Sequence, residues 1–193
     1  MVTVTFLDGT KKDVSSGTTI ADCILHHIGE GLFRAAVAAK IDDHVVDLAT
    51  PITTDCTLTV LTFKDDEGKA IYWHSTAHIL AIAVTRLFPQ AKLTIGPPID
   101  EGFYYDFAID TPFTDKDLEN IEAEMKKIIK EKIPFVRKTI TYEESQALFS
   151  DNTYKKEIVE EYKKDGLTIY ENGEFYDLCK GPHVLDTGRI KAV

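Results

Sequence analysis

A long apolar segment near the middle of the chain constrains the fold more than any other feature. The segment IYWHSTAHILAIAVTRLF spans residues 71–88, and Pro89 follows it. Because proline ends helices, we expect one long helix from about Glu67 to Phe88. Its apolar content predicts burial, yet His74 and His78 stand four residues apart and therefore share one helical face. The rest of the chain must explain why a buried helix carries two imidazoles.

The composition indicates a globular protein. The chain has 193 residues, 44% of them hydrophobic and 28% charged, which suffices for one ordinary domain or two small ones. The longest uninterrupted apolar run covers residues 79–84, far below the roughly 18 residues of a membrane span. The N-terminus lacks the apolar core of a signal peptide, so we expect a cytoplasmic protein without a membrane partner.

The cysteines and the charge exclude further classes of protein. Cys23, Cys56 and Cys179 show no paired spacing, which argues against a disulfide framework and indicates a reducing compartment. The net charge is −10, from 22 basic and 32 acidic residues. Since phosphate affinity comes mainly from Lys and Arg, any RNA contact must be local or must be helped by another part of the protein.

Residues 1–63 predict a small β-grasp, or ubiquitin-like, domain. VTVTFLDGTKKDV alternates apolar and polar residues around an Asp-Gly turn, and TTIADCILHHI has helical spacing. The short apolar runs AAVAAKI, HVVDL and TLTVLTF follow, separated by polar turns. This order resembles the TGS module, which stands at the front of threonyl-tRNA synthetases, some GTPases and stringent-response enzymes. A fold resemblance of this kind does not by itself define a function.

Residues 64–193 predict an α+β domain with an antiparallel sheet and the long buried helix. Thr114 with Asp117 and Thr141 with Glu144 have capping-box spacing at the starts of two further helices. AKLTIGPP and GFYYDFAI look like strands, and LTIYENGEFYDLC predicts a hairpin around an Asn-Gly turn. The loop KGPH follows that hairpin.

The segment DLCKGPH supplies a second group of reactive side chains. Asp177, Cys179 and His183 lie at the end of a strand and in a Gly-Pro loop, where reactive groups are commonly displayed. Together with His74 and His78, the Cys and the third His could form a tetrahedral zinc site or a metal-free cluster that holds a water for attack on a carbonyl. A hydrogen-bonded histidine pair in a core is the alternative for HSTAH taken alone.

Four motifs carry a resemblance to a known family. HSTAH, IGPPIDEGFYYDF, YKKE and DLCKGPH, in this order, resemble the editing domain of bacterial-type threonyl-tRNA synthetases, which is related to that of alanyl-tRNA synthetases. With the TGS-like unit in front, the resemblance covers essentially the whole chain. It implies post-transfer editing, which is hydrolysis of the ester in threonine-specific tRNA that carries serine by mistake.

The resemblance also implies what this chain does not contain. We expect it to stop before the aminoacylation core, so ATP binding, the zinc of that core, the ligase activity and the anticodon-binding domain lie elsewhere in the full enzyme. The full enzyme is expected to be a homodimer through its core, and this fragment a monomer. The expected partner is the 3′ acceptor end of threonine-specific tRNA.

The resemblance implies roles for the catalytic candidates. His74, His78, Cys179 and His183 would place the water and the seryl carbonyl or hydroxyl, a task suited to an imidazole near neutral pH. Asp177 would orient an imidazole or the substrate amine, unless it is a solvent-facing hairpin residue. In a separate part of the chain, Lys155 of YKKE would contact the 3′-terminal phosphate or the oxyanion. A solvated position is the alternative for this lysine, because its helix is rich in Lys and Glu.

Three residues are candidates for substrate binding. Tyr104 or Tyr105 would stack on the terminal adenine. Strand alternation allows only one of them to face the site, and we expect the other in the core. Lys180 would contact a phosphate, although it stands where Arg is more often expected.

Two other functions remain open. A zinc-dependent hydrolase with another substrate would use His74, His78, Cys179 and His183 as ligands. A non-catalytic tRNA-binding module would need none of this chemistry, but the acidic balance opposes it because RNA binders usually carry a basic patch. For editing, we expect no required cofactor as the first choice, with zinc possible at the His/Cys cluster.

Overall fold

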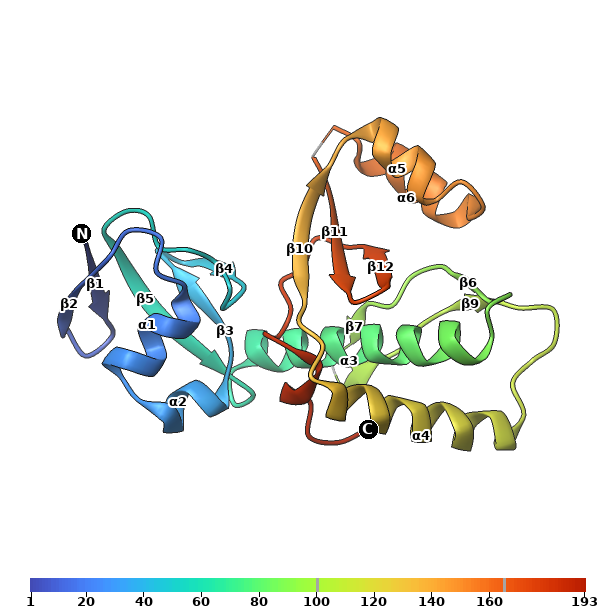
Figure 1. Ribbon diagram of the computed structural model, residues 1–193, viewed down its shortest axis with the longest axis horizontal. Coiled ribbons are helices and arrows are strands. Elements are labelled where there is room, and N and C mark those ends of the chain that lie inside the picture. The colour runs from blue at the N-terminus through green and yellow to red at the C-terminus, as the bar shows by residue number, and fades with distance from the viewer. Residues whose placement is uncertain (100, 165) are drawn as a thin grey trace. The chain divides into compact units, whose positions relative to one another are not determined.

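The computed structural model describes residues 1–99, 101–164 and 166–193, which form two compact units. The first unit comprises residues 1–72 and 182–185, and the second comprises residues 73–181 and 186–193. Both units combine helices with strands, which confirms the predicted α+β class (Figure 1). Asp100 of the IGPPIDEGFYYDF motif lies outside the described residues. Among the described residues, no helix has both the length and the apolar character that a bilayer crossing requires.

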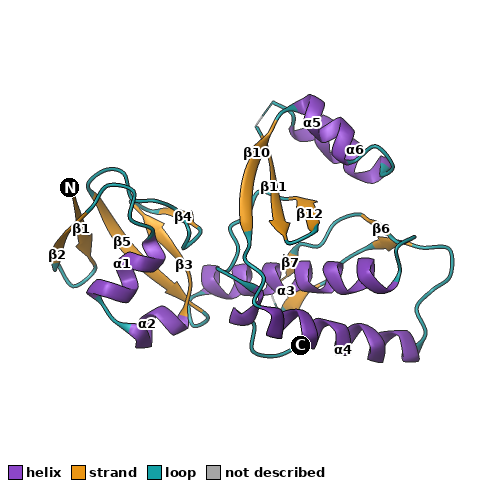
Figure 2. Cartoon of the chain, viewed as in Figure 1, coloured by secondary structure: helices purple, strands orange, loops and turns teal. Residues whose placement is uncertain are grey.

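The first unit is a five-stranded sheet with two helices, as Figure 2 shows. Its elements in chain order are β1 (Val2–Phe6), β2 (Lys11–Val14), α1 (Ile20–His27), α2 (Glu30–Ala35), β3 (Ala36–Ile41), β4 (His44–Val46) and β5 (Cys56–Thr62). The strand order is β2-β1-β5-β3-β4, and β1 runs parallel to β5 while the other pairs are antiparallel. This is the predicted β-grasp arrangement, to which the sequence analysis had not assigned α2.

Local chemistry explains why this sheet forms. Asp42 and Asp43 have positive φ angles of 47° and 70°, the conformation that a two-residue hairpin turn requires between β3 and β4. Fully buried Val4, Ile24 and Leu58 bring β1, α1 and β5 into one apolar core. The alternating pattern of the sequence therefore places the apolar faces of the helix and the sheet together.

The helix α3 (Asp66–Leu87) confirms the predicted long helix almost to the residue. Residues 75–84 are buried except for Leu80, so polar Ser75 and Thr76 lie inside along with the apolar side chains. A helix that is enclosed all round belongs to the interior of its domain. α3 therefore offers His78 a fully enclosed position, and the ring of His74 a half-buried one.

The second unit contains a three-stranded antiparallel sheet in the order β10-β11-β12, with two small two-stranded sheets. Its remaining elements are β6 (Lys92–Leu93), β7 (Pro98–Ile99), β8 (Gly102–Phe103), β9 (Phe107–Ala108), α4 (Asp115–Glu131), β10 (Val136–Ile140), α5 (Tyr142–Leu148), α6 (Thr153–Tyr162), β11 (Leu167–Asn172), β12 (Phe175–Leu178) and a 3-10 turn (Thr187–Arg189). Both capping boxes are present, at the starts of α4 and α5, as predicted. The β11–β12 hairpin is also confirmed, with Gly173 at φ 64° in its turn.

Some predictions about the second unit need correction. AKLTIGPP and GFYYDFAI form only two-residue strands, because β6 pairs with β9 and β7 with β8 over two positions each. β10 was not predicted, since its VRKTI sequence lacks apolar alternation and four of its five residues are exposed. It is held instead by pairing with β11.

One apolar contact and one set of ion pairs position the elements that carry the site. On one face of the sheet, Phe149 and Val159 of the α5–α6 region pack against Leu167 and Ile169 of β11. On α3, the Arg86 guanidinium joins two carboxylates of α4, Glu124 and Glu131, at 3.2 and 2.9 Å. These contacts fix α6 to the sheet and α4 to α3, as Figure 1 shows for the second unit.

Candidate functional site

A cavity of about 310 Å³ lies within the second unit, between the first half of α3, the Ile95–Pro97 segment, α6 and the β11–β12 hairpin. Its volume falls at the small end of the range for ligand pockets. Most of the residues that the sequence singled out line it: His74, His78, Tyr105, Lys155, Asp177, Cys179 and Lys180. Segments far apart in the sequence thus meet at one small cavity.

The two histidines of α3 and Cys179 form one cluster. The ring centroids of His74 and His78 lie 5.3 Å apart with an interplanar angle of 85°. Cys179 Sγ lies 3.4 Å from His74 Nε2, and the N–H of Gly181 donates to the same sulfur at 3.3 Å. One donor atom of each of these three side chains lies within 4.8 Å of the others. Such a group could hold a metal ion.

Burial keeps both imidazoles neutral at pH 7. Desolvation lowers the pKa of His74 from 6.5 to about 4, although the charge of Asp177 acts in the opposite direction. The pKa of His78 is also lowered, by desolvation first and then by His74 and Lys155. A neutral imidazole can accept a proton or bind a metal ion, so both side chains are in the form that either chemistry requires.

A buried ion pair also lines the cavity. Lys155 Nζ is 2.7 Å from Asp177 Oδ1, and each of the two side chains is at most 4% exposed. Tyr105 Oη donates to Asp177 Oδ2 at 2.6 Å, and the N–H of Leu178 donates to Oδ1 at 2.8 Å. The alternatives of a solvated Lys155 and a solvent-facing Asp177 are therefore wrong. α6 points this lysine inward, and the hairpin turns the aspartate into the domain.

The two tyrosines of GFYYDF differ in their surroundings. The ring of Tyr105 stacks on Phe107 with centroids 4.8 Å apart, and a Cβ on Gly96 would lie only 2.1 Å from this tyrosine. Burial raises the pKa of Tyr105 well above its ordinary value, so its hydroxyl stays protonated as a donor. Tyr104 is 41% exposed, whereas Tyr105 packs in an apolar core cluster with Ala77 and Ala81, so Tyr105 is the tyrosine expected in the core. Adenine stacking stays a prediction.

Lys180 lies at the edge of the cavity. Its side chain is exposed, and Nζ lies 3.9 Å from the ring centroid of Tyr162, at the end of α6. This distance indicates a cation–π contact. Tyr162 was not predicted for the site, because it is the last residue of a helix rich in charged residues. The predicted phosphate contact of Lys180 stays a prediction.

His183 is fully buried, and its backbone N–H donates to Asp47 Oδ1 at 2.7 Å. It belongs to residues 182–185, which group with the first unit. Its predicted role beside Cys179 stays a prediction.

Two glycines that the sequence analysis did not assign to the site shape it. Gly181 has a φ of 69°, and a Cβ there would lie 2.0 Å from Tyr170 Oη. Gly96 makes room for Tyr105, as described above. Both glycines precede a proline, in KGPH and in IGPP, and these Gly-Pro dipeptides were the signal that could have identified them.

Two domain families match parts of the chain. Residues 2–62 match the TGS domain, and residues 167–193 match the threonyl and alanyl tRNA synthetase second additional domain. The second match contains Asp177, Cys179, Lys180 and His183. The chain is thus similar to a TGS domain in its first part and to the second additional domain of threonyl and alanyl tRNA synthetases at its C-terminal end.

Several curated relatives are threonine–tRNA ligases. The chain is 47% identical to a threonine–tRNA ligase of Desulforamulus reducens and 48% identical to one of Symbiobacterium thermophilum, in both cases over 100% of its length. It is 47% identical to a threonine–tRNA ligase of Caldanaerobacter subterraneus over 98% of its length. The chain spans 30 to 31% of the length of these relatives. It is thus related along its whole length to the N-terminal region of threonine–tRNA ligases.

The buried ion pair gives a prediction about stability. Asp177→Asn leaves the Lys155 ammonium buried without a counter-charge, so the free energy of unfolding should fall by about 3–5 kcal/mol. As a control, Glu171→Gln removes a more exposed pair, with Lys138, from the same sheet. It should cost less than about 1 kcal/mol. Urea unfolding of both variants measures the difference, and equally small losses would contradict the assigned burial.

The lowered pKa of His74 predicts a pH-dependent stability. Between pH 6.5 and about 4 the unfolded chain binds a proton on this residue and the folded chain does not. Stability should therefore fall as the pH drops through this window, by up to about 1.4 kcal/mol per pH unit from His74 alone. Urea unfolding at several pH values should show a shallower slope for His74→Gln. Replacing exposed His27 by Gln is the control, and identical slopes for wild type and His74→Gln would refute the prediction.

Proposed function

We propose that the second unit hydrolyses the ester bond of threonine-specific tRNA that carries serine, as the editing domain of a threonine–tRNA ligase. One observation carries the proposal. Two neutral imidazoles, a thiol and a buried Lys–Asp–Tyr network line a single small cavity. This chemistry suits attack of water on an ester, and the sequence relationship to threonine–tRNA ligases supplies the substrate class.

The size of the cavity suits the discrimination that editing requires. Serine keeps the hydroxyl of threonine but lacks one methyl, and a methyl in a pocket contributes only about 1–3 kcal/mol, or roughly 10 to 200-fold. A second, smaller site that excludes the extra methyl supplies the missing selectivity. The cavity volume of about 310 Å³ is consistent with a site of this kind.

The histidines are the proposed source of general base catalysis. One neutral imidazole accepts a proton from water while the water oxygen bonds to the ester carbonyl carbon. The same proton then passes to the ribose oxygen as the ester C–O bond breaks, so serine and free tRNA result. Desolvation lowers the pKa of both imidazoles, but the charge of Asp177 partly offsets this effect at His74, whereas His74 and Lys155 add to it at His78. His74 is therefore the better candidate for the base. His78, Cys179 and His183 would orient the water and the seryl group.

The buried network is the proposed source of charge stabilisation. In the tetrahedral intermediate the carbonyl oxygen becomes an anion, and a fixed cation in a dry site stabilises it more than a mobile one in water. The Lys155 ammonium is held by Asp177 in such a place, so we assign it to the oxyanion and not to a phosphate. Exposed Lys180 and Tyr104 are better placed for the phosphate and the adenine.

Zinc is compatible with the donor set. Bond lengths of zinc to nitrogen and sulfur imply donor separations of roughly 3.3–3.8 Å in a tetrahedral site. The 3.4 Å between Cys179 Sγ and His74 Nε2 falls in this range, and with His78 as a third ligand the fourth position would be left for a water. When bound, zinc would lower the pKa of a coordinated water. The proposed steps rely only on the side chains.

Deacylation rates test the proposal. The chain should hydrolyse the seryl ester on threonine-specific tRNA and spare the threonyl ester. His78→Ala and Cys179→Ala should each slow the reaction by about 100-fold or more, which is the usual share of a general base and its partners. His26→Ala, at the exposed end of α1, is the matched control and should react as wild type does. A chelator should leave the wild-type rate unchanged.

Other outcomes would select other functions. If wild type binds tRNA but hydrolyses neither ester, editing is refuted. Stoichiometric zinc without deacylation would favour a zinc hydrolase with another substrate. If no hydrolysis is seen and the cluster mutations leave tRNA binding unchanged, the chain is a non-catalytic RNA-binding module.

A further inference from the structure

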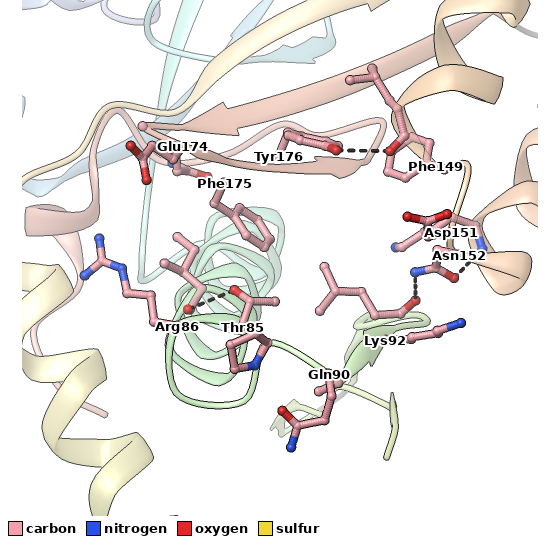
Figure 3. A pocket seen from close by; sticks show the side chains of 18 of the residues that line it. Thr85, Arg86, Gln90, Lys92, Phe149, Asp151, Asn152, Glu174, Phe175 and Tyr176 are labelled. Atoms are coloured by element: carbon pink, nitrogen blue, oxygen red, sulfur yellow. Dashed lines mark hydrogen bonds between the residues drawn. The ribbon is translucent and has the colours of Figure 1, made fainter. Parts of the chain in front are cut away.

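Asn152 connects two parts of the second unit through one side chain. It is the N-cap of α6, the helix that carries Lys155. Its Oδ1 accepts a hydrogen bond from the N–H of Lys155 at 3.2 Å, and its Nδ2 donates to the carbonyl of Leu93 in β6 at 2.8 Å (Figure 3). The amide thus ties the start of α6 to a strand that is distant in sequence.

The strand β6 leads to Tyr105. Leu93 pairs with Phe107 of β9, and the ladder continues with the N–H of Asp106 donating to the carbonyl of Ile95 at 2.9 Å. The ring of Phe107 stacks on Tyr105. The pairing of β6 with β9 therefore fixes the tyrosine relative to Leu93.

These contacts form a closed circuit around the ion pair. From Tyr105 the circuit runs through its hydroxyl to Asp177, from there to Lys155, and through the cap back to Asn152. Lys155 and Asn152 also line a second cavity of about 940 Å³, which Figure 3 shows. The start of α6 therefore lies between two cavities, and the Asn152–Leu93 hydrogen bond joins it to β6.

We propose that Asn152 is a positioning residue that holds Lys155 in register with Tyr105 and Asp177 in the editing site. This inference rests on the proposed function of that site. Without the Leu93 bond, α6 still packs on the β-sheet through Val159, but its first turn can shift relative to β6. A displacement of this kind moves the ammonium away from the developing oxyanion, so it slows the chemical step more than substrate binding.

A cap that only stabilises its helix is the simpler role, and three variants separate the two. Asn152→Asp keeps an oxygen that can cap α6, and a negative charge suits a helix N-terminus, but it cannot donate to Leu93. Asn152→Ala loses both bonds. Thr141→Ala removes the corresponding cap from α5, which carries none of the site residues.

Kinetics and melting temperature distinguish the roles. For deacylation of the seryl ester, Asn152→Asp should lower kcat at least tenfold, with KM within about twofold and Tm close to wild type. Asn152→Ala should lower both kcat and Tm, whereas Thr141→Ala should lower Tm alone. In a Lys155→Met background, Asn152→Asp should cause no further loss, because the asparagine acts through the lysine. Wild-type kcat in Asn152→Asp overturns the proposal.

Hydrogen exchange provides a readout that does not need activity. The amides of Thr94 and Asp106 donate across the β6–β9 ladder, and they should exchange faster in Asn152→Asp but not in Thr141→Ala. Unchanged exchange in Asn152→Asp overturns the proposed tie, whether or not the chain deacylates. If exchange increases while wild type itself hydrolyses neither ester, the proposed function fails and the structural tie stands.

Discussion

The ion pair between Lys155 and Asp177 is the interaction on which the rest of the site depends. Removing two charges from water is costly, and a buried pair persists only where its geometry and hydrogen bonds offset that cost. Here Tyr105 and the Leu178 N–H complete the coordination of the carboxylate. Since these groups come from α6, β12 and the GFYYDF segment, forming the pair requires all three to be in place. The cavity lies between these elements and α3.

The two kinds of ionisable group in the site differ in their partners. Burial removes the charge from His74 and His78, whose pKa values are lowered mainly by desolvation. The lysine and the aspartate instead face each other at 2.7 Å in an equally enclosed place. The result is a fixed cation beside neutral bases in a small volume. The proposed ester hydrolysis would use this combination, because the base must accept a proton while the carbonyl oxygen gains negative charge.

Local sequence signals predicted much of the fold and part of the site. The capping boxes at Thr114 and Thr141, the proline after α3 and the Asn-Gly hairpin are each defined by a few neighbouring residues. Such signals also placed HSTAH on a helix and DLCKGPH at the end of a strand. The resemblance then supplied the expectation that the two motifs meet, and the cluster of His74, His78 and Cys179 has the geometry this requires.

What the sequence did not reveal depends on contacts between distant segments. The pattern of α6 suggested a solvated Lys155, and only the position of Asp177 more than 20 residues later explains why the lysine faces inward. β10 carries mostly exposed residues and exists because β11 offers it a partner. Strand alternation predicts that Tyr104 and Tyr105 face opposite sides, but it does not predict which of the two is buried.

Binding of a substrate mimic to the isotope-labelled chain is the most direct measurement of the central claim, that the cavity of about 310 Å³ receives the seryl end of tRNA. The mimic would be adenosine joined to serine through a non-hydrolysable amide. We expect it to shift the imidazole NMR signals of His74 and His78, and we expect the threonyl mimic to bind at least tenfold more weakly. Equal binding of both mimics, or shifts confined to Arg86 and Lys92 of the larger cavity, would contradict the account.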